Sequence, residues 1–139
     1  MSTLENPQPV SVTNDEWLRQ LVGEDKALQQ RAMNYLNALA DRLVGQSPGA
    51  FSGFATVPGS GYARLASDAP VKVHVDGNGF DQVVASETAS VIVSLFTWSW
   101  LAHDCAQEAD RDVVDDVYYN LRYWALQRED ASEILAAID

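Results

Sequence analysis

The chain of 139 residues has a single cysteine, Cys105, and no apolar run long enough to cross a bilayer. A lone cysteine cannot form a disulfide within the chain, and the first ten residues, MSTLENPQPV, lack the basic and apolar regions of a signal peptide. The most apolar stretch, residues 89–102, has about fourteen residues, whereas a membrane helix needs roughly twenty. We therefore expect a cytoplasmic protein that does not contact the membrane.

Basic residues are also few. Nine lysines and arginines stand against twenty aspartates and glutamates, which gives a net charge of −11 at neutral pH. This charge repels the phosphates of nucleic acids and of anionic membranes, so direct binding of nucleic acid is not expected. The two histidines lie far apart in the sequence, and no zinc-ligand spacing exists. We predict neither a metal site nor a cofactor.

Helical periodicity covers both ends of the chain, where apolar side chains recur at intervals of three and four. Five helices are expected, over residues 13–22, 25–44, 86–105, 110–127 and 130–138. Asp130 and Glu133 form a capping pattern at the start of the last helix. The helix over 86–105 is apolar on almost every face, so we predict that it lies at the centre of the fold.

The middle of the chain has the two-residue period of strands. Short aromatic and β-branched runs predict three antiparallel strands, over residues 51–57, 61–66 and 71–76. The chain is thus predicted to have an α+β fold, with a small three-stranded antiparallel sheet packed against about five helices. We expect a single domain over residues 13–139, after a poorly ordered tail formed by residues 1–12.

The segment TVPGSGYARL, residues 56–65, resembles a phosphate-binding loop in its glycines. A Walker loop needs a Gly-Lys-Ser/Thr ending followed by a helix, and a dinucleotide loop needs GxGxxG between a strand and a helix. Here the glycines lie between two strand-like runs and no lysine is present. The segment is therefore predicted to be the turn of a β-hairpin.

A catalytic triad is suggested by the order of His103, Asp104 and Cys105. Residues two positions apart on a helix point roughly 200° away from each other, so His103 and Cys105 cannot form a hydrogen-bonded pair there. Each is better explained as a residue of the core or its rim, and we predict no catalytic residue. His74, in a strand with alternating polar residues, is expected to be exposed.

Aromatic side chains are dense in the helices over 86–105 and 110–127 and could line a ligand cleft. Their helical spacing favours packing in the core instead. We expect Trp100, Tyr119 and Tyr123 to reach the surface.

The carboxylates of the C-terminal third form two groups along the sequence. One interpretation is a solvated surface whose charges complement helix dipoles. The other is a surface that engages a basic protein, or that imitates the phosphates of DNA. On the second interpretation, nine carboxylates are candidate contacts to a partner: Asp104, Glu108, Asp110, Asp112, Asp115, Asp116, Asp130, Glu133 and Asp139.

Four segments together suggest a family. They are GFATVPGSGYARL, VDGNGF, SETASVIVSLFTWSWLAHD and DVYYNLRYWALQREDASEILAAID, and in this order they extend over residues 53–139, about two thirds of the chain. On these segments the chain is identified as a divergent member of the small antirestriction proteins of plasmids and other mobile elements, the ArdB and KlcA type. The resemblance implies a compact α+β protein that protects incoming DNA from type I restriction enzymes and is not itself an enzyme.

Two functions stay open at this point. In the first, the protein inhibits restriction by contacts with a type I restriction enzyme or an associated host protein, acting as a monomer or weak homodimer. In the second, a small-molecule-binding or hydrolytic domain uses a pocket between sheet and helices, with His103 or His74 as acid or base. The first is favoured because the sequence offers no paired base and nucleophile.

Overall fold

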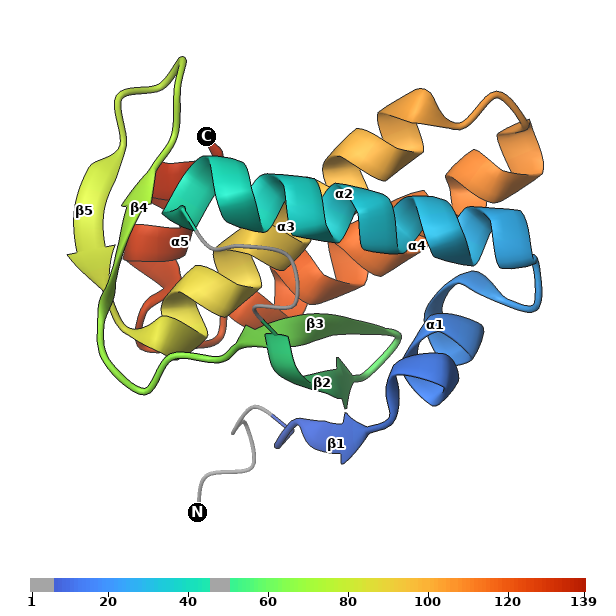
Figure 1. Ribbon diagram of the computed structural model, residues 1–139, viewed down its shortest axis with the longest axis horizontal. Helices are drawn as coiled ribbons and strands as arrows, with labels where there is room; N and C mark the ends of the chain where they lie inside the picture. The colour runs from blue at the N-terminus through green and yellow to red at the C-terminus, as the bar shows by residue number, and fades with distance from the viewer. Residues whose placement is uncertain (1–6, 46–50) are drawn as a thin grey trace.

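The computed structural model describes residues 7–45 and 51–139, and Figure 1 shows the path of the chain. The elements are β1 (Val10–Val12), α1 (Asn14–Val22), α2 (Lys26–Val44), β2 (Phe51–Val57), β3 (Ser60–Leu65), β4 (Val71–His74), β5 (Asp81–Val84), α3 (Ser86–Asp104), α4 (Glu108–Ala125) and α5 (Ala131–Ile138). The predicted α+β class is confirmed. Among the described residues, no helix is long and apolar enough to cross a membrane.

The first two helices begin and end at the capping residues that the sequence pattern predicts. The hydroxyl of Thr13 accepts a hydrogen bond from the N–H of Glu16 at 3.2 Å, and the carboxylate of Asp25 accepts two from the first turn of α2. Gly45 ends α2 with φ at 68°, in the left-handed region that side chains other than glycine rarely adopt.

The three-stranded sheet has the order β1-β2-β3 and is antiparallel throughout. Its third member is therefore β1 and not the predicted strand at 71–76. That segment forms β4, which pairs with β5 in a separate two-stranded sheet. Residues 10–12, expected within a poorly ordered tail, instead pair with β2, whereas residues 1–6 lie outside the described part of the chain. An alternating pattern identifies a strand but does not identify its partner.

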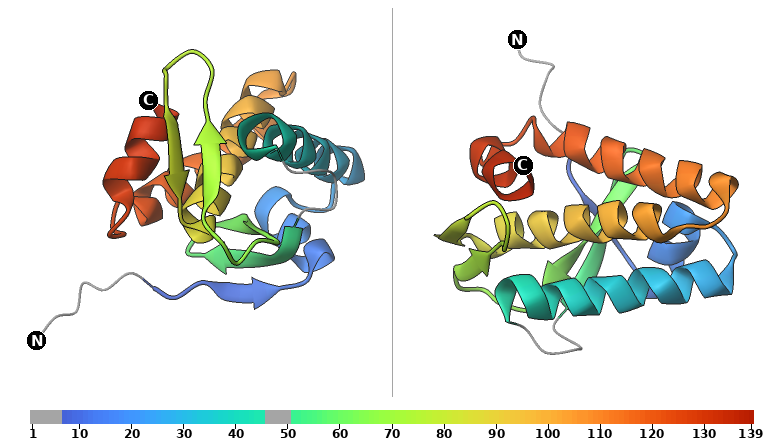
Figure 2. Two further views of the ribbon diagram at one scale, coloured as in Figure 1. Left: turned by 60° about the vertical axis from the view of Figure 1, so that its left-hand side comes forward. Right: turned by 90° about the horizontal axis from the view of Figure 1, so that it is seen from above.

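Helix α3 is the central element, as predicted. Seen from above in Figure 2, it lies between α2 and α4, with the three-stranded sheet beneath all three helices. Its side chains Val91, Leu95 and Trp98 are fully buried, whereas Phe96 is only partly buried. The side of α2, α3 and α4 that is turned away from the sheet is called the helical face below.

Two serines of α3 cover the free edge of β3. Ser94 Oγ accepts a hydrogen bond from the N–H of Ala63 at 3.0 Å, and Ser90 Oγ accepts one from the N–H of Leu65 at 2.9 Å. These N–H groups belong to the side of β3 with which no strand of the described residues pairs. A buried backbone donor without a partner is costly, so the serines explain polar residues in an otherwise apolar helix.

Candidate functional site

The glycine-rich segment is a β-hairpin, as predicted. Residues 58–59 form the turn between β2 and β3, and the N–H of the Trp98 indole donates to the carbonyl of Gly61 at 3.1 Å. A Cβ added at Gly61 would lie 2.5 Å from the carbonyl oxygen of Ala55 and 2.6 Å from Nε1 of Trp17. Position 61 therefore requires glycine, because the close packing leaves no room for a side chain.

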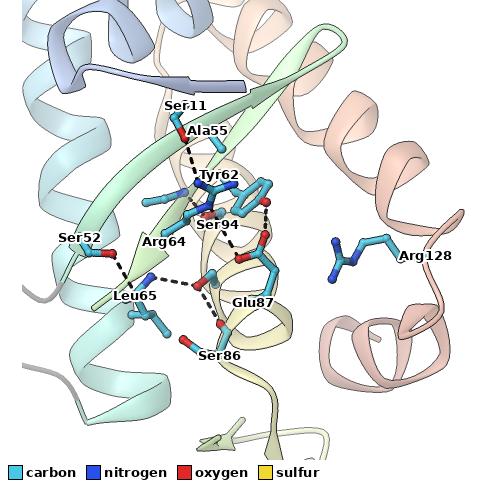
Figure 3. A network of polar contacts seen from close by, with 12 residues as sticks. Ser11, Ser52, Ala55, Tyr62, Arg64, Leu65, Ser86, Glu87, Ser94 and Arg128 are labelled. Carbon is cyan, nitrogen blue, oxygen red and sulfur yellow. Dashed lines mark hydrogen bonds and ion pairs between the residues drawn. The ribbon is translucent and has the colours of Figure 1, made fainter. Parts of the chain in front are cut away.

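Behind the hairpin, a polar network ties the sheet to the start of α3 (Figure 3). The hydroxyl of Tyr62 donates to the carboxylate of Glu87, and Nε of Arg64 lies 3.8 Å from the same carboxylate. Arg64 also donates to the hydroxyl of Ser11 in β1 at 3.0 Å. Burial, together with the hydrogen bond to Glu87, raises the pKa of Tyr62 to about 12. The phenol therefore remains protonated at neutral pH and works as a structural donor.

The VDGNGF segment, one of those that suggested the family, has a structural role as well. In the β4–β5 connection, the side chain of Asn78 accepts a hydrogen bond from the N–H of Phe80 at 2.9 Å and donates to the carbonyl of Ala137 at 2.7 Å. Phe80 is buried. The loop therefore anchors the last turn of α5.

The histidines and the cysteine do not assemble into a triad. Cys105 directly follows α3 and is 2% exposed, and burial raises the pKa of its thiol. His103 is exposed, and so is His74, whose Nε2 lies 2.9 Å from a carboxylate oxygen of Asp76. Among the described residues, no group of three or more histidines, cysteines and carboxylates could hold a metal ion.

The nine carboxylates form two groups along the chain. Asp104 ends α3, and the next five lie on α4: Glu108, Asp110, Asp112, Asp115 and Asp116. The other three, Asp130, Glu133 and Asp139, begin, occupy and follow α5. Ile138, which precedes Asp139, lines a small hollow together with Ser99 and Tyr118. Asp139 therefore lies close to the helical face, whereas Asp130 and Glu133 lie at the start of α5.

Several of these carboxylates have partners within the chain. Asp104 forms an ion pair with Arg31 at 2.8 Å, and this hydrogen-bonded arginine holds the pKa of Asp104 below its usual range. The carboxylate of Asp130 does not cap α5 and instead receives hydrogen bonds from other side chains. An oxygen of Asp139 lies 3.9 Å from Nη2 of Arg122.

The helical face carries two hollows that meet at α3. One, of about 440 Å³, is lined by Tyr35, Ser99, Trp100, His103 and Asp104. The other, of about 490 Å³, lies between α3 and α4 and is lined by Ser99, Ala102, His103, Arg111, Asp115, Tyr118 and Tyr119. Trp100, Tyr119 and Tyr123 are 39%, 61% and 71% exposed, as their spacing predicted. The helical face therefore combines aromatic rings, hollows and carboxylates.

A family model for the antirestriction protein family matches residues 48–139. The chain belongs to the antirestriction protein family. The part that matches includes β2 to β5 and α3 to α5, and with them the hairpin and two of the three helices of the helical face. The identification made from the sequence segments is confirmed.

Two relatives from Escherichia coli, both named antirestriction protein KlcA, are similar to this family member. One is 32% identical over 99 residues, which are 70% of this chain and 68% of the relative. The other is 28% identical over 145 aligned positions that cover both chains completely.

A solved structure is similar over the full length of both chains, with a TM-score of 0.81 and 26% identity. It comes from work on the KlcA and ArdB proteins, which are described as having a novel fold and antirestriction activity against type I DNA restriction systems in vivo but not in vitro. The fold of this chain is thus the fold of that family.

Proposed function

We propose that this protein protects incoming DNA from type I restriction through contacts with a protein of the host cell, without catalysis. The observation that carries the proposal is the similarity, over the whole chain, to a structure described as active against type I systems in cells. That activity is described as absent in vitro. A partner present only in the cell accounts for such a difference, so the target is either the restriction enzyme in its cellular state or an associated host protein.

Charge supports a protein partner. The net charge of −11 opposes the approach of a nucleic acid, and it favours association with a basic protein surface. The nine carboxylates remain the proposed contacts, divided between the helical face and α5. Within the second group, Glu133 and Asp139 are the better candidates, because Asp130 is held by internal hydrogen bonds. That the protein acts as a monomer or a weak homodimer stays a prediction.

The alternative function, a small-molecule-binding or hydrolytic domain, has less support. Cys105 is buried with a raised thiol pKa, which disfavours the reactive thiolate. His103 lies in the hollows of the helical face, whereas His74 lies on the exposed β4–β5 hairpin. The two histidines therefore do not share a site.

The test is a plating assay with unmodified phage on a host that carries a type I restriction system. Cells that express the protein should give a higher plating efficiency than cells with the empty vector. Two controls should plate equally with and without the protein. They are modified phage on the restricting host, and unmodified phage on a host without the restriction subunit. Equal plating of unmodified phage on both strains, with the protein shown to be folded and expressed, would exclude the proposed function.

A further inference from the structure

Helix α4 carries a straight exposed stripe on the helical face. Asp112, Asp116, Tyr119 and Tyr123 follow one another at intervals of four, three and four, so they lie along one line of the helix. The rings of Tyr119 and Tyr123 are 61% and 71% exposed. Tyrosine is enriched among the residues that contribute most to protein interfaces, and two adjacent exposed rings provide an apolar anchor.

Beside the stripe lies the hollow between α3 and α4. Its lining includes the small residues Ser99 and Ala102. It also includes Tyr118 and Tyr119, whose rings pack edge to face with their centroids 5.1 Å apart. Asp115 also lines it. The volume of about 490 Å³ falls within the range of ligand pockets, so a long side chain of a partner fits here.

The carboxylates next to this hollow lack a basic partner within the described part of the chain. Among the described residues, no ion pair includes Asp112, Asp115 or Asp116. They lie beyond the first turn of α4, where the helix dipole no longer favours an anion. Asp112 and Asp116 are like charges four residues apart, an arrangement that destabilises a helix. A cationic partner would remove this repulsion.

We propose that the helical face binds a basic segment of the partner protein, with an arginine of that segment entering the α3–α4 hollow between Asp115 and the rings of Tyr118 and Tyr119. Arginine is favoured over lysine because its planar guanidinium stacks on aromatic rings and also binds a carboxylate through two hydrogen bonds. Arg111, which lines the same hollow, donates to the carbonyl of Cys105 at 2.9 Å and is thereby directed to the loop before α4.

This inference rests on the proposed function and names the chemistry of its partner. The first test uses a short alanine-based peptide that carries arginines, with lysine and glutamine versions as controls. NMR should show shifts at Ser99, His103 and Tyr119, which line the hollow, on addition of the arginine peptide, while signals of the β4–β5 hairpin remain unchanged. The affinity should fall as salt is added, and the lysine and glutamine versions should bind more weakly. Shifts spread evenly over all acidic surfaces would overturn the inference.

Variants sharpen the test. Asp115→Asn should weaken binding of the arginine peptide on the order of tenfold, because it removes a charge-assisted contact. Asp68→Asn, which removes an exposed carboxylate from the loop between β3 and β4, should change it by less than about twofold. Tyr119→Ala should weaken binding, whereas Tyr119→Phe, which keeps the ring, should retain it. Equal binding by all four variants would overturn the inference.

The plating assay then separates the two proposals. If the wild-type protein protects phage and the double variant Tyr119→Ala/Tyr123→Ala, with unchanged melting temperature, does not, the docking inference is supported. If both protect equally, the docking inference is wrong and the proposed function stands. If the wild-type protein gives no protection, the proposed function is wrong, and the peptide measurements alone decide whether the hollow binds arginine.

Discussion

Arg128 binds both carboxylate oxygens of Asp130: its Nε lies 2.8 Å from Oδ1, and its Nη2 lies 3.1 Å from Oδ2. The hydroxyl of Thr88 donates to the same carboxylate at 2.5 Å, so the start of α3 is joined to the start of α5. Only 14% of the Asp130 side chain is exposed. Burial opposes ionisation, but the hydrogen bonds from Arg128 and Thr88 outweigh it and hold the pKa of Asp130 below its usual range.

Asp130→Asn should therefore lower the free energy of unfolding at neutral pH by about 1.5–3 kcal/mol, the range for a hydrogen bond to a charged group. The lowered pKa stabilises the fold above the unfolded value of about 3.9, and this contribution is lost as the pH falls through the folded value. Urea unfolding over a series of pH values measures both effects. The variant should show a smaller loss of stability in acid, and identical curves would contradict the prediction.

Gly61→Ala should destabilise the β2–β3 hairpin by about 1–3 kcal/mol, because the new methyl group would collide with the Ala55 carbonyl and the Trp17 indole. Gly53→Ala is the matched control, since a Cβ there meets nothing within 4 Å. Thermal unfolding followed by circular dichroism compares the two variants. Equal melting temperatures would show that the hairpin tolerates a side chain at Gly61.

His103→Gln and Cys105→Ser should leave antirestriction activity nearly unchanged, because the proposed mechanism has no covalent or proton-transfer step. Cys105→Ser places a hydroxyl at a buried position and should cost about 1–3 kcal/mol of stability. Plating efficiency is measured beside circular dichroism, so that loss of folding is recognised. A folded Cys105→Ser variant without activity would favour the hydrolytic alternative, whereas loss in His103→Gln alone would point to the hollow that His103 lines.

The double variant Glu133→Gln/Asp139→Asn tests the C-terminal carboxylates while leaving those of α4 intact. If a basic partner meets α5, protection of incoming DNA should decrease while the melting temperature barely moves. Among the described residues Glu133 forms no ion pair, and the ion pair of Asp139 with Arg122, at 3.9 Å, is largely exposed and contributes little to stability. Asp130 is left unchanged in this variant, because its removal would also weaken the fold. Wild-type protection would exclude α5 as a contact and leave the helical face.

Several features of the fold could be predicted from local pattern. The helical period and the caps identify α1 and α2, and the position of the glycines between two strand-like runs identifies the hairpin. The exposure of Trp100, Tyr119 and Tyr123 follows from helical spacing. These properties depend on residues close in sequence, so a single chain is enough to predict them.

Long-range pairing could not be predicted in this way. A strand of three residues, Val10–Val12, has too short a pattern to be recognised, and β5 has no clear alternation. The role of Ser90 and Ser94 was also missed, although two serines four residues apart in an apolar helix were a signal for a polar partner on one side.

The sequence alone determined the acidic character of this protein, its family and the type of most of its elements, because these depend on composition and on neighbours along the chain. Only the tertiary structure decided which carboxylates are available to a partner. Asp130 carries the same charge as Asp115, yet folding places Asp130 against Arg128 and Thr88, and Asp115 beside an open hollow. That difference arises from contacts between residues far apart in sequence, which no local pattern records.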